Sequence, residues 1–191
     1  MRAFLFKMNK IIGKKIIRYK EIDSTNDEAK RLIKRGLGEG TLIVSGSQTK
    51  GKGKPGSAWF SPAEVGAYLS AILRPFKNPK DIASITILGA RAVVTAVEKL
   101  SGLKAEIKLP NDLILHGKKL GGILVERMAS GHLIIGMGVN VNNRAGSFPP
   151  EIRKTATSLK IESGRDFDLE EFLNRLISEL NKEYLAYLVK I

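Results

Sequence analysis

Four strand-like segments follow one another between residues 104 and 139, with no helical pattern among them. The connections between them are short and contain turn-forming residues: Pro110, Gly117 and Gly131. Consecutive strands joined by short turns pair in antiparallel fashion. This stretch therefore predicts an antiparallel meander, with strands over residues 104–108, 112–115, 120–127 and 133–139.

Helical patterns flank this meander on both sides. Apolar residues recur at helical spacing from Pro79 to Leu100, before a stop at Gly102, and again along one stripe that begins at Asp168. A third helix is expected to begin near Thr25, with that hydroxyl as its cap, and to end at Gly36. Further strands are expected over residues 15–22, 41–45 and 66–73. Helices grouped around a mixed, mostly antiparallel sheet give an α+β fold, and the lack of repeats or linkers predicts one domain, residues 1–191.

Charge and cysteine content limit the chemistry. The chain has 32 Lys+Arg against 19 Asp+Glu, a net charge of +13, and no Cys. The missing thiols exclude disulfides, cysteine nucleophiles, zinc knuckles and iron–sulfur sites. The apolar runs are too short for a membrane span or a signal peptide, so we expect a soluble, cytoplasmic protein. The positive surplus is typical of a protein with an anionic partner, which could be nucleic acid, a polyanionic small substrate or an acidic protein, and the alternative is a solvated Lys-rich surface without a function.

A glycine-rich segment from Gly46 to Pro62 lies between two predicted strands and carries three lysines, Lys50, Lys52 and Lys54. It does not open a helix, as a Rossmann turn must, and Gly53 stands where a Walker A loop needs a hydroxyl for Mg²⁺. Glycines let backbone amides approach phosphate oxygens, whose charge the lysines neutralise. The alternative is a disordered basic hairpin, which Trp59 at the end of the segment disfavours.

A second polar segment is Lys108-Leu109-Pro110-Asn111-Asp112. Proline fixes a bend there and gathers the polar side chains around it. The amide of Asn111 offers the donor and acceptor that read an adenine edge, and Asp112 is a candidate Mg²⁺ ligand. The alternative is a turn in which Asn and Asp bond their own backbone. Glycines within the strands that follow, at Gly121-Gly122 and Gly136–Gly138, are typical of places where a ligand approaches the backbone.

Taken in order, these segments resemble the catalytic domain of biotin protein ligases. The resemblance covers roughly residues 16 to 190, and it rests on five motifs in the expected order and spacing. They are Ser24-Thr25-Asn26, Gln48 to Trp59, Lys108 to Asp112, Lys119 to Glu126, and Gly136 to Asn140.

The resemblance implies the α+β fold of class II aminoacyl-tRNA synthetases and of biotin and lipoate ligases. It also implies a two-step reaction, in which biotin and ATP give biotinyl-5′-AMP and pyrophosphate, and biotin then passes to a lysine of a biotin carboxyl carrier protein. ATP and biotin are the implied substrates, and Mg²⁺ is the implied metal ion.

The resemblance also assigns residues. The biotin-binding residues would be Ser24, Thr25, Asn26, Gln48, Lys52, Gly53, Lys54, Lys119, Gly121 and Gly122. The residues that bind ATP or the adenylate would be Gly51, Lys52, Lys54, Trp59, Lys108, Asn111, Lys119, Gly138 and Asn140. The catalytic residues would be Lys108, Lys54 and Asp112, and Asp112 is also the implied Mg²⁺ ligand.

The sequence departs from the family at a few positions. Lys52 and Lys54 stand where most relatives have Arg, which keeps the charge and gives up the bidentate fork. Leu109 replaces the usual Trp. We expect neither the N-terminal winged helix of the repressor-type members nor the small C-terminal β-barrel, and therefore no specific DNA binding.

Several alternatives stay open at this point. A lipoate or octanoate ligase has the same fold, but Gln48 and the basic loop favour biotin. A non-catalytic biotin-binding homologue is a second alternative. A basic nucleic-acid-binding module is a third, although it would be expected to interleave aromatic residues with its cations. The expected partners are an acidic carrier domain and, since relatives commonly pair edge strands, a second copy of the chain.

Overall fold

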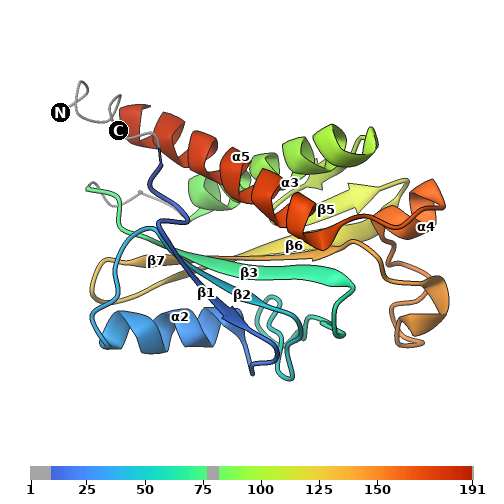
Figure 1. Cartoon of the computed structure of the whole chain (residues 1–191), viewed down its shortest axis with the longest axis horizontal. Helices are drawn as coiled ribbons and strands as arrows, with labels where there is room; N and C mark the ends of the chain where they lie inside the picture. The colour runs from blue at the N-terminus through green and yellow to red at the C-terminus, as the bar shows by residue number, and fades with distance from the viewer. Residues whose placement is uncertain (1–9, 77–81, 191) are drawn as a thin grey trace.

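The computed structural model describes residues 10–76 and 82–190. They form one sheet between two layers of helices, with α3 and α5 on one face and α2 on the other (Figure 1). The helical elements are α2 (Thr25–Lys34), α3 (Ala83–Ser101), the 3₁₀ turn η1 (Ala145–Ser147), α4 (Leu159–Ser163) and α5 (Leu169–Lys190). The strands are β1 (Lys15–Tyr19), β2 (Thr41–Ser45), β3 (Gly66–Leu73), β4 (Glu106–Lys108), β5 (Asp112–Leu115), β6 (Lys118–Arg127) and β7 (Leu133–Asn140).

The sheet has the strand order β1-β2-β3-β7-β6-β5-β4. Strands β1 and β2 are parallel, because α2 connects them, and every other neighbouring pair is antiparallel. The prediction of an α+β fold with a mixed, mostly antiparallel sheet is therefore confirmed. The meander expected from the sequence forms one half of the sheet, and β3 pairs with its last strand.

The two faces of the sheet have different coverings. The large apolar core lies between the sheet and the helices α3 and α5, and it includes Leu69, Val93, Ile135 and Leu176, all of them fully buried. The face under α2 has a small apolar cluster of Ala29, Leu32, Ile43, Ile72 and Ile134. Side chains alternate between the faces along each strand, so one strand supplies both layers. Much of the α2 face is thus left for polar residues.

The helix ends follow the sequence signals with one correction. The cap of α2 is Ser24, whose Oγ accepts a hydrogen bond from the backbone N–H of Asp27, and not Thr25 as the sequence predicted. Thr25 does not act as the cap because its hydroxyl donates a hydrogen bond to Gln48 instead. Gly102 ends α3 with a φ of 76°, as expected. The expected start of α3 at Pro79 lies outside the described residues.

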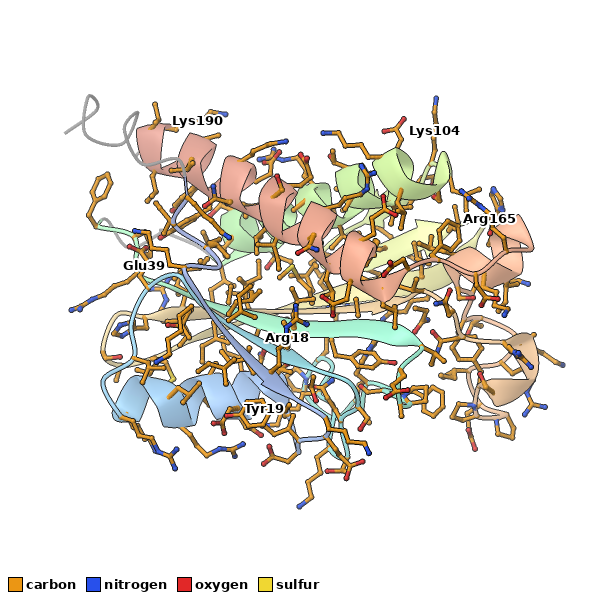
Figure 2. All side chains as sticks on the ribbon, in the orientation of Figure 1. Arg18, Tyr19, Glu39, Lys104, Arg165 and Lys190 are labelled. Carbon is orange, nitrogen blue, oxygen red and sulfur yellow. The ribbon has the colours of Figure 1, made fainter. Side chains whose placement is uncertain are left out.

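The charged side chains lie mainly at the outside of the molecule. Lys104, Arg165 and Lys190 are exposed and stand at its periphery in Figure 2. Tyr19 on β1 lies over α2, where its hydroxyl donates to Glu28 at 2.8 Å. Within residues 10–76 and 82–190, none of the helices has the length and the apolar character that a membrane crossing needs.

Candidate active site

A cavity lies on the α2 face of the sheet. The first turn of α2 forms one wall, a hairpin within the glycine-rich segment forms another, and β6 and β7 form the floor. Twelve of the predicted site residues line it: Ser24, Thr25, Asn26, Gln48, Lys52, Gly53, Lys54, Trp59, Asn111, Lys119, Gly122 and Gly138. The lining residues to which the sequence assigned no ligand-binding role are Ser57, Ala58, Ile123, Leu124 and Met137, and Gly136 lines the cavity as a strand glycine that the sequence had singled out.

The strand register explains how residues far apart in sequence reach this cavity. Residues directly opposite one another share a face of a sheet, and Lys108, Asp112, Gly122 and Gly138 are successive opposite partners across β4, β5, β6 and β7. Across the sheet, this row carries one cationic side chain, one anionic side chain and then two glycines. Because the glycines have no side chains, they leave space above the floor of the cavity.

Trp59 occupies the space over the two glycines. A Cβ atom at Gly138 would come 2.4 Å from Trp59 Nε1, and one at Gly122 would come 3.7 Å from the same ring. The indole N–H is buried and has no hydrogen-bond partner among the described residues. Lys119 Nζ lies 5.7 Å from the centre of the ring. Glycine is therefore needed at position 138 for the indole to sit on the sheet.

One end of the cavity is a hydrogen-bonded polar cluster. The backbone N–H and the hydroxyl of Thr25 both donate to Gln48 Oε1, at 2.8 and 3.1 Å. The amide of Gln48 donates in turn to Ser61 Oγ at 2.9 Å. Ser70 Oγ, fully buried on β3, lies 2.8 Å from Thr25 Oγ1. This bonding fixes which way the Gln48 side chain presents its oxygen and nitrogen.

Asn26 belongs to the wall of this end. Its Oδ1 accepts from Ser70 at 2.6 Å, and its Nδ2 donates to Glu126 at 2.8 Å. Both ends of the amide are therefore engaged within the protein. A Cβ at Gly136 would come 2.2 Å from Asn26 Oδ1, so glycine is required there too. Ser70 and Glu126 were not predicted as site residues, although a lone serine in an apolar strand was an available signal.

The other end of the cavity is cationic. Lys52 Nζ donates to Asp27 at 2.6 Å, Lys119 Nζ lies 2.6 Å from Asp112 Oδ1, and Lys54 lines the cavity with its side chain exposed. Burial opposes ionisation of Asp27, but the hydrogen bonds from Lys52 and from a second lysine on α2 hold the pKa of that carboxyl below its usual value. The carboxylates thus hold the ammonium groups in place.

The glycine-rich segment is an ordered hairpin at this position. Trp59 N–H donates to the carbonyl of Gly51 at 2.9 Å, Gly53 N–H donates to Ser57 at 2.9 Å, and Ser57 N–H donates to Lys54 at 2.8 Å. These hydrogen bonds favour a built hairpin over the alternative of a disordered basic segment. A Cβ at Gly51 would come 2.4 Å from the Trp59 carbonyl oxygen, so Gly51 serves the closure of the hairpin and does not line the cavity.

A second cavity adjoins the first. Ala58, Trp59 and Lys119 line both. The second cavity continues over mainly apolar residues, which are Phe60, Phe148, Ile152 and Ala156, with Thr155 and Asn140.

Two asparagines near these cavities have a buried side-chain oxygen without a partner. Asn140 Nδ2 donates to the Thr157 carbonyl at 2.9 Å, while its buried Oδ1 has no partner among the described residues. Asn111 has the same pattern, with Nδ2 donating to Ile123 at 3.0 Å and Oδ1 unpartnered. Buried acceptors without partners favour a ligand with N–H donors.

The remaining predicted residues lie outside both cavities. Lys108 is exposed at the end of β4. Asp112 lines neither cavity, but it pairs with Lys119, which lines both. Gly121 faces the opposite side of the sheet, where a Cβ would come 3.0 Å from Leu113 of the apolar core. The prediction that Gly121 opens the site to ligand is therefore corrected to a packing role, because side chains alternate along β6.

Metal binding was predicted at Asp112. Within residues 10–76 and 82–190, no three His, Cys, Asp or Glu side chains gather as a metal cluster would require. Mg²⁺ often binds through one or two carboxylates together with substrate phosphates, and Asp112 offers a single carboxylate, whose Oδ1 already pairs with Lys119 at 2.6 Å. The assignment stays a prediction.

Comparison with known sequences places this geometry in a family. A sequence model of the biotin/lipoate A/B protein ligase family matches residues 19–140, which is more than half of the chain. The chain belongs to this family. The matched range contains both walls of the cavity, its glycine floor and Asn140.

Relatives and solved structures in the family agree with this placement. The bifunctional ligase/repressor BirA of Bacillus subtilis is 35% identical over 182 residues, which are 93% of this chain and 56% of that protein. The biotin–[acetyl-CoA-carboxylase] ligase of Paracoccus denitrificans is 35% identical over 81% of this chain and 66% of that protein. The Aquifex aeolicus biotin protein ligase, solved with biotin and ATP, is 33% identical with a TM-score of 0.83, over 93% of this chain and 73% of that chain. The chain thus spans little more than half the length of the Bacillus BirA relatives that it matches.

Proposed function

We propose that this domain is the catalytic part of an ATP-dependent biotin protein ligase. The observation that carries the proposal is one cavity with a polar, hydrogen-bonded end at Thr25 and Gln48 and a cationic end at Lys52, Lys54 and Lys119. Biotin has a ureido ring at one end and a carboxylate at the other, so it matches both ends of the cavity. The 33% identical Aquifex enzyme, solved with biotin and ATP, supports the assignment.

The polar end distinguishes biotin from lipoate. A ureido ring offers one carbonyl and two N–H groups, which need hydrogen-bonding partners when they are buried. Gln48 and the hydroxyls of Ser24 and Thr25 can supply such partners. A lipoyl ring carries no such groups and would gain no hydrogen bonds from this cluster, which favours biotin.

Adenylation needs charge neutralisation more than it needs a protein nucleophile. A biotin carboxylate oxygen attacks the α-phosphorus of ATP, the bond from that phosphorus to the bridging oxygen breaks, and pyrophosphate leaves. Carboxylate and phosphate repel each other unless cations lie between them. Lys119 lies at the junction of the two cavities, and Lys108 stands in the same row of the sheet. Bound Mg²⁺ would add positive charge at the phosphates, with Asp112 as its protein ligand.

The second cavity is suited to the nucleoside. Adenine presents an exocyclic amine, and the unpartnered Oδ1 of Asn140, which lines this cavity, is an acceptor for such a group, whereas Asn111 lines the first cavity. The indole of Trp59 and the nearby Phe60 and Phe148 give apolar surface for the base. We therefore assign the first cavity to biotin and the second to adenosine, with the phosphate where they meet.

In the second step the lysine amine of a carrier domain attacks the biotinyl carbonyl and AMP leaves. The ion pair with Lys119 favours an orienting role for Asp112 over that of a general base. A basic enzyme fits an acidic carrier, and we expect the association to weaken as salt shortens the Debye length below about 8 Å. We further propose a cytoplasmic location, where ATP is supplied, and a homodimer formed through edge strands.

Isotope exchange between pyrophosphate and ATP tests the proposal. The reaction contains Mg²⁺ and either biotin, lipoate or no acid. Exchange with biotin alone is expected. Exchange with lipoate alone would move the chain to the sister activity in the family, and an absence of exchange with either acid would overturn the adenylation step. Equilibrium dialysis with biotin would then identify a non-catalytic binder.

A further inference from the structure

Asp27 joins two walls of the cavity. It lies in the first turn of α2, directly after Ser24, Thr25 and Asn26, and its Oδ1 accepts hydrogen bonds from Lys52 at 2.6 Å and from Lys30 at 3.1 Å. Lys30 also bonds Glu126 at 2.7 Å, so the carboxylate is anchored to β6 as well. Its surroundings hold it in a fixed position opposite the hairpin.

The hairpin itself has few ties to α2. The segment leading into it is attached by backbone bonds, from Thr49 N–H to Ile22 at 2.9 Å and from Lys50 N–H to Asp23 at 2.8 Å. From Gly51 to Trp59, the backbone hydrogen bonds described above run within the hairpin. Among the described residues, the ion pair of Lys52 with Asp27 is the charged contact that joins this part to the helix, while Trp59 contacts the sheet glycines and Lys119.

We propose that Asp27 is a positioning residue that holds the glycine-rich hairpin, and Trp59 with it, closed over the cavity through Lys52. The effect on catalysis rests on the proposed function, whereas closure of the hairpin can be tested without any substrate. Asp27 touches neither cavity and acts through Lys52, which lines the first one. Closure matters because the adenylate is a mixed anhydride that water destroys.

The single tryptophan of the chain makes closure measurable without any ligand. Its indole N–H is buried in the closed hairpin and would become accessible on opening. In D27N and in K52M, we expect the opened population, measured by acrylamide quenching of Trp59 fluorescence, to rise about two- to fivefold. K50M removes the same charge two residues away and should leave the quenching unchanged, and D27E should restore it.

A double variant separates the latch from a general weakening of α2. If the two residues act as one pair, D27N/K52M opens no further than either single variant, whereas independent effects would add. K52M leaves the first turn of α2 intact, so equal quenching in K52M and D27N excludes a fold defect. Unchanged quenching in D27N, or additive effects in the double variant, would overturn the proposal.

A catalytic readout then connects the latch to the chemistry. In D27N we expect faster loss of biotinyl-5′-AMP to solvent, by about two- to fivefold, with a smaller change in the rate of pyrophosphate exchange at saturating substrates. Equal losses in both rates would contradict a latch and indicate a role in the chemical step. If the wild-type protein shows no exchange with biotin, the proposed function fails, and the fluorescence still decides the latch.

Discussion

The two faces of the central sheet are built from the same strands but show opposite chemistry. Along β7, Ile135, Met137 and Val139 point into the core under α3 and α5, and the intervening Gly136 and Gly138 face α2 and the hairpin. The first set fills space, and the second leaves space for Asn26 and Trp59. Stability and function are therefore separated by face, residue by residue, within one strand.

This separation explains why the site can be polar without weakening the domain. The apolar face carries most of the large buried side chains, so the α2 face can hold buried Ser70 and Asn26, with the half-buried Gln48, in a hydrogen-bonded cluster. Substitutions on the core face should change stability and spare activity, and those on the site face should do the reverse. Substitutions on each face can test this separation of stability from activity.

The largest effect is expected on the core face. Phe172 of α5 is fully buried, and Phe172→Ala should lower the free energy of unfolding by about 3–5 kcal/mol because it leaves a cavity. Urea denaturation measures this loss, and pyrophosphate exchange at low temperature should stay near the wild-type rate. A large loss of exchange in protein that is still folded would show that the two faces are coupled.

Next comes the cationic end of the site. Lys108 is exposed, so Lys108→Ala should change stability by no more than about 0.5 kcal/mol. We expect it to slow adenylate formation by a factor on the order of 10²–10³, because it removes charge stabilisation from the transition state. Single-turnover formation of biotinyl-5′-AMP, with biotin binding measured in parallel, checks this. Equal rates would remove Lys108 from the mechanism.

A pair of glycines gives the most direct test of the contrast. Gly138→Ala places a Cβ atom 2.4 Å from Trp59 Nε1, and by displacing the indole it should reduce exchange by up to about 10²-fold. Gly89→Ala on α3 places a Cβ 2.5 Å from Ile135 Cδ1, the flexible end of a core side chain, and alanine favours the helix by about 1 kcal/mol. This control should keep full activity, and a comparable loss in both variants would be hard to reconcile with separate faces.

The smallest effect concerns acid. Arg31 hydrogen bonds lower the pKa of Asp23, at the base of the hairpin, to about 2. A carboxyl with a lowered pKa stabilises the folded state above its unfolded pKa of about 4, and the stabilisation is lost as pH falls toward 2. Because Asp23 is 38% exposed, the contribution should be below about 1 kcal/mol. In urea denaturation measured at pH values from roughly 5 to 2, the window that the two pKa values define, the free energy of unfolding should fall less steeply with pH in Asp23→Asn than in the wild-type protein.

Sequence periodicity predicted the elements of both faces better than it predicted their contacts. The strands and long helices appeared because alternation and helical spacing extend over many residues. The five-residue helix α4 did not, since so short a segment has no readable period. Choosing Ser24 over Thr25 as the cap of α2 required knowing that the Thr25 hydroxyl bonds Gln48.

The candidate site was predictable where a motif is local. Gly122, Gly138 and Trp59 stand out in the sequence and do meet in space. Ser70 was missed because its partner Asn26 lies 44 residues away, and Asp27 was missed because its partner lies in the hairpin 25 residues on. Such pairs depend on strand order and register, which no local pattern contains.

The pairing of β7 on both edges has a consequence for how this domain can change. Eight residue pairs join it to β3 and seven join it to β6. A one-residue insertion that shifted β7 would exchange Gly136 and Gly138 for isoleucine and methionine beneath the indole, and would turn glycines into the core. Insertions and deletions within β7 should therefore not be tolerated, whether they arise by mutation or by design. The turn at Gly131 lies beyond both ladders and can accommodate them.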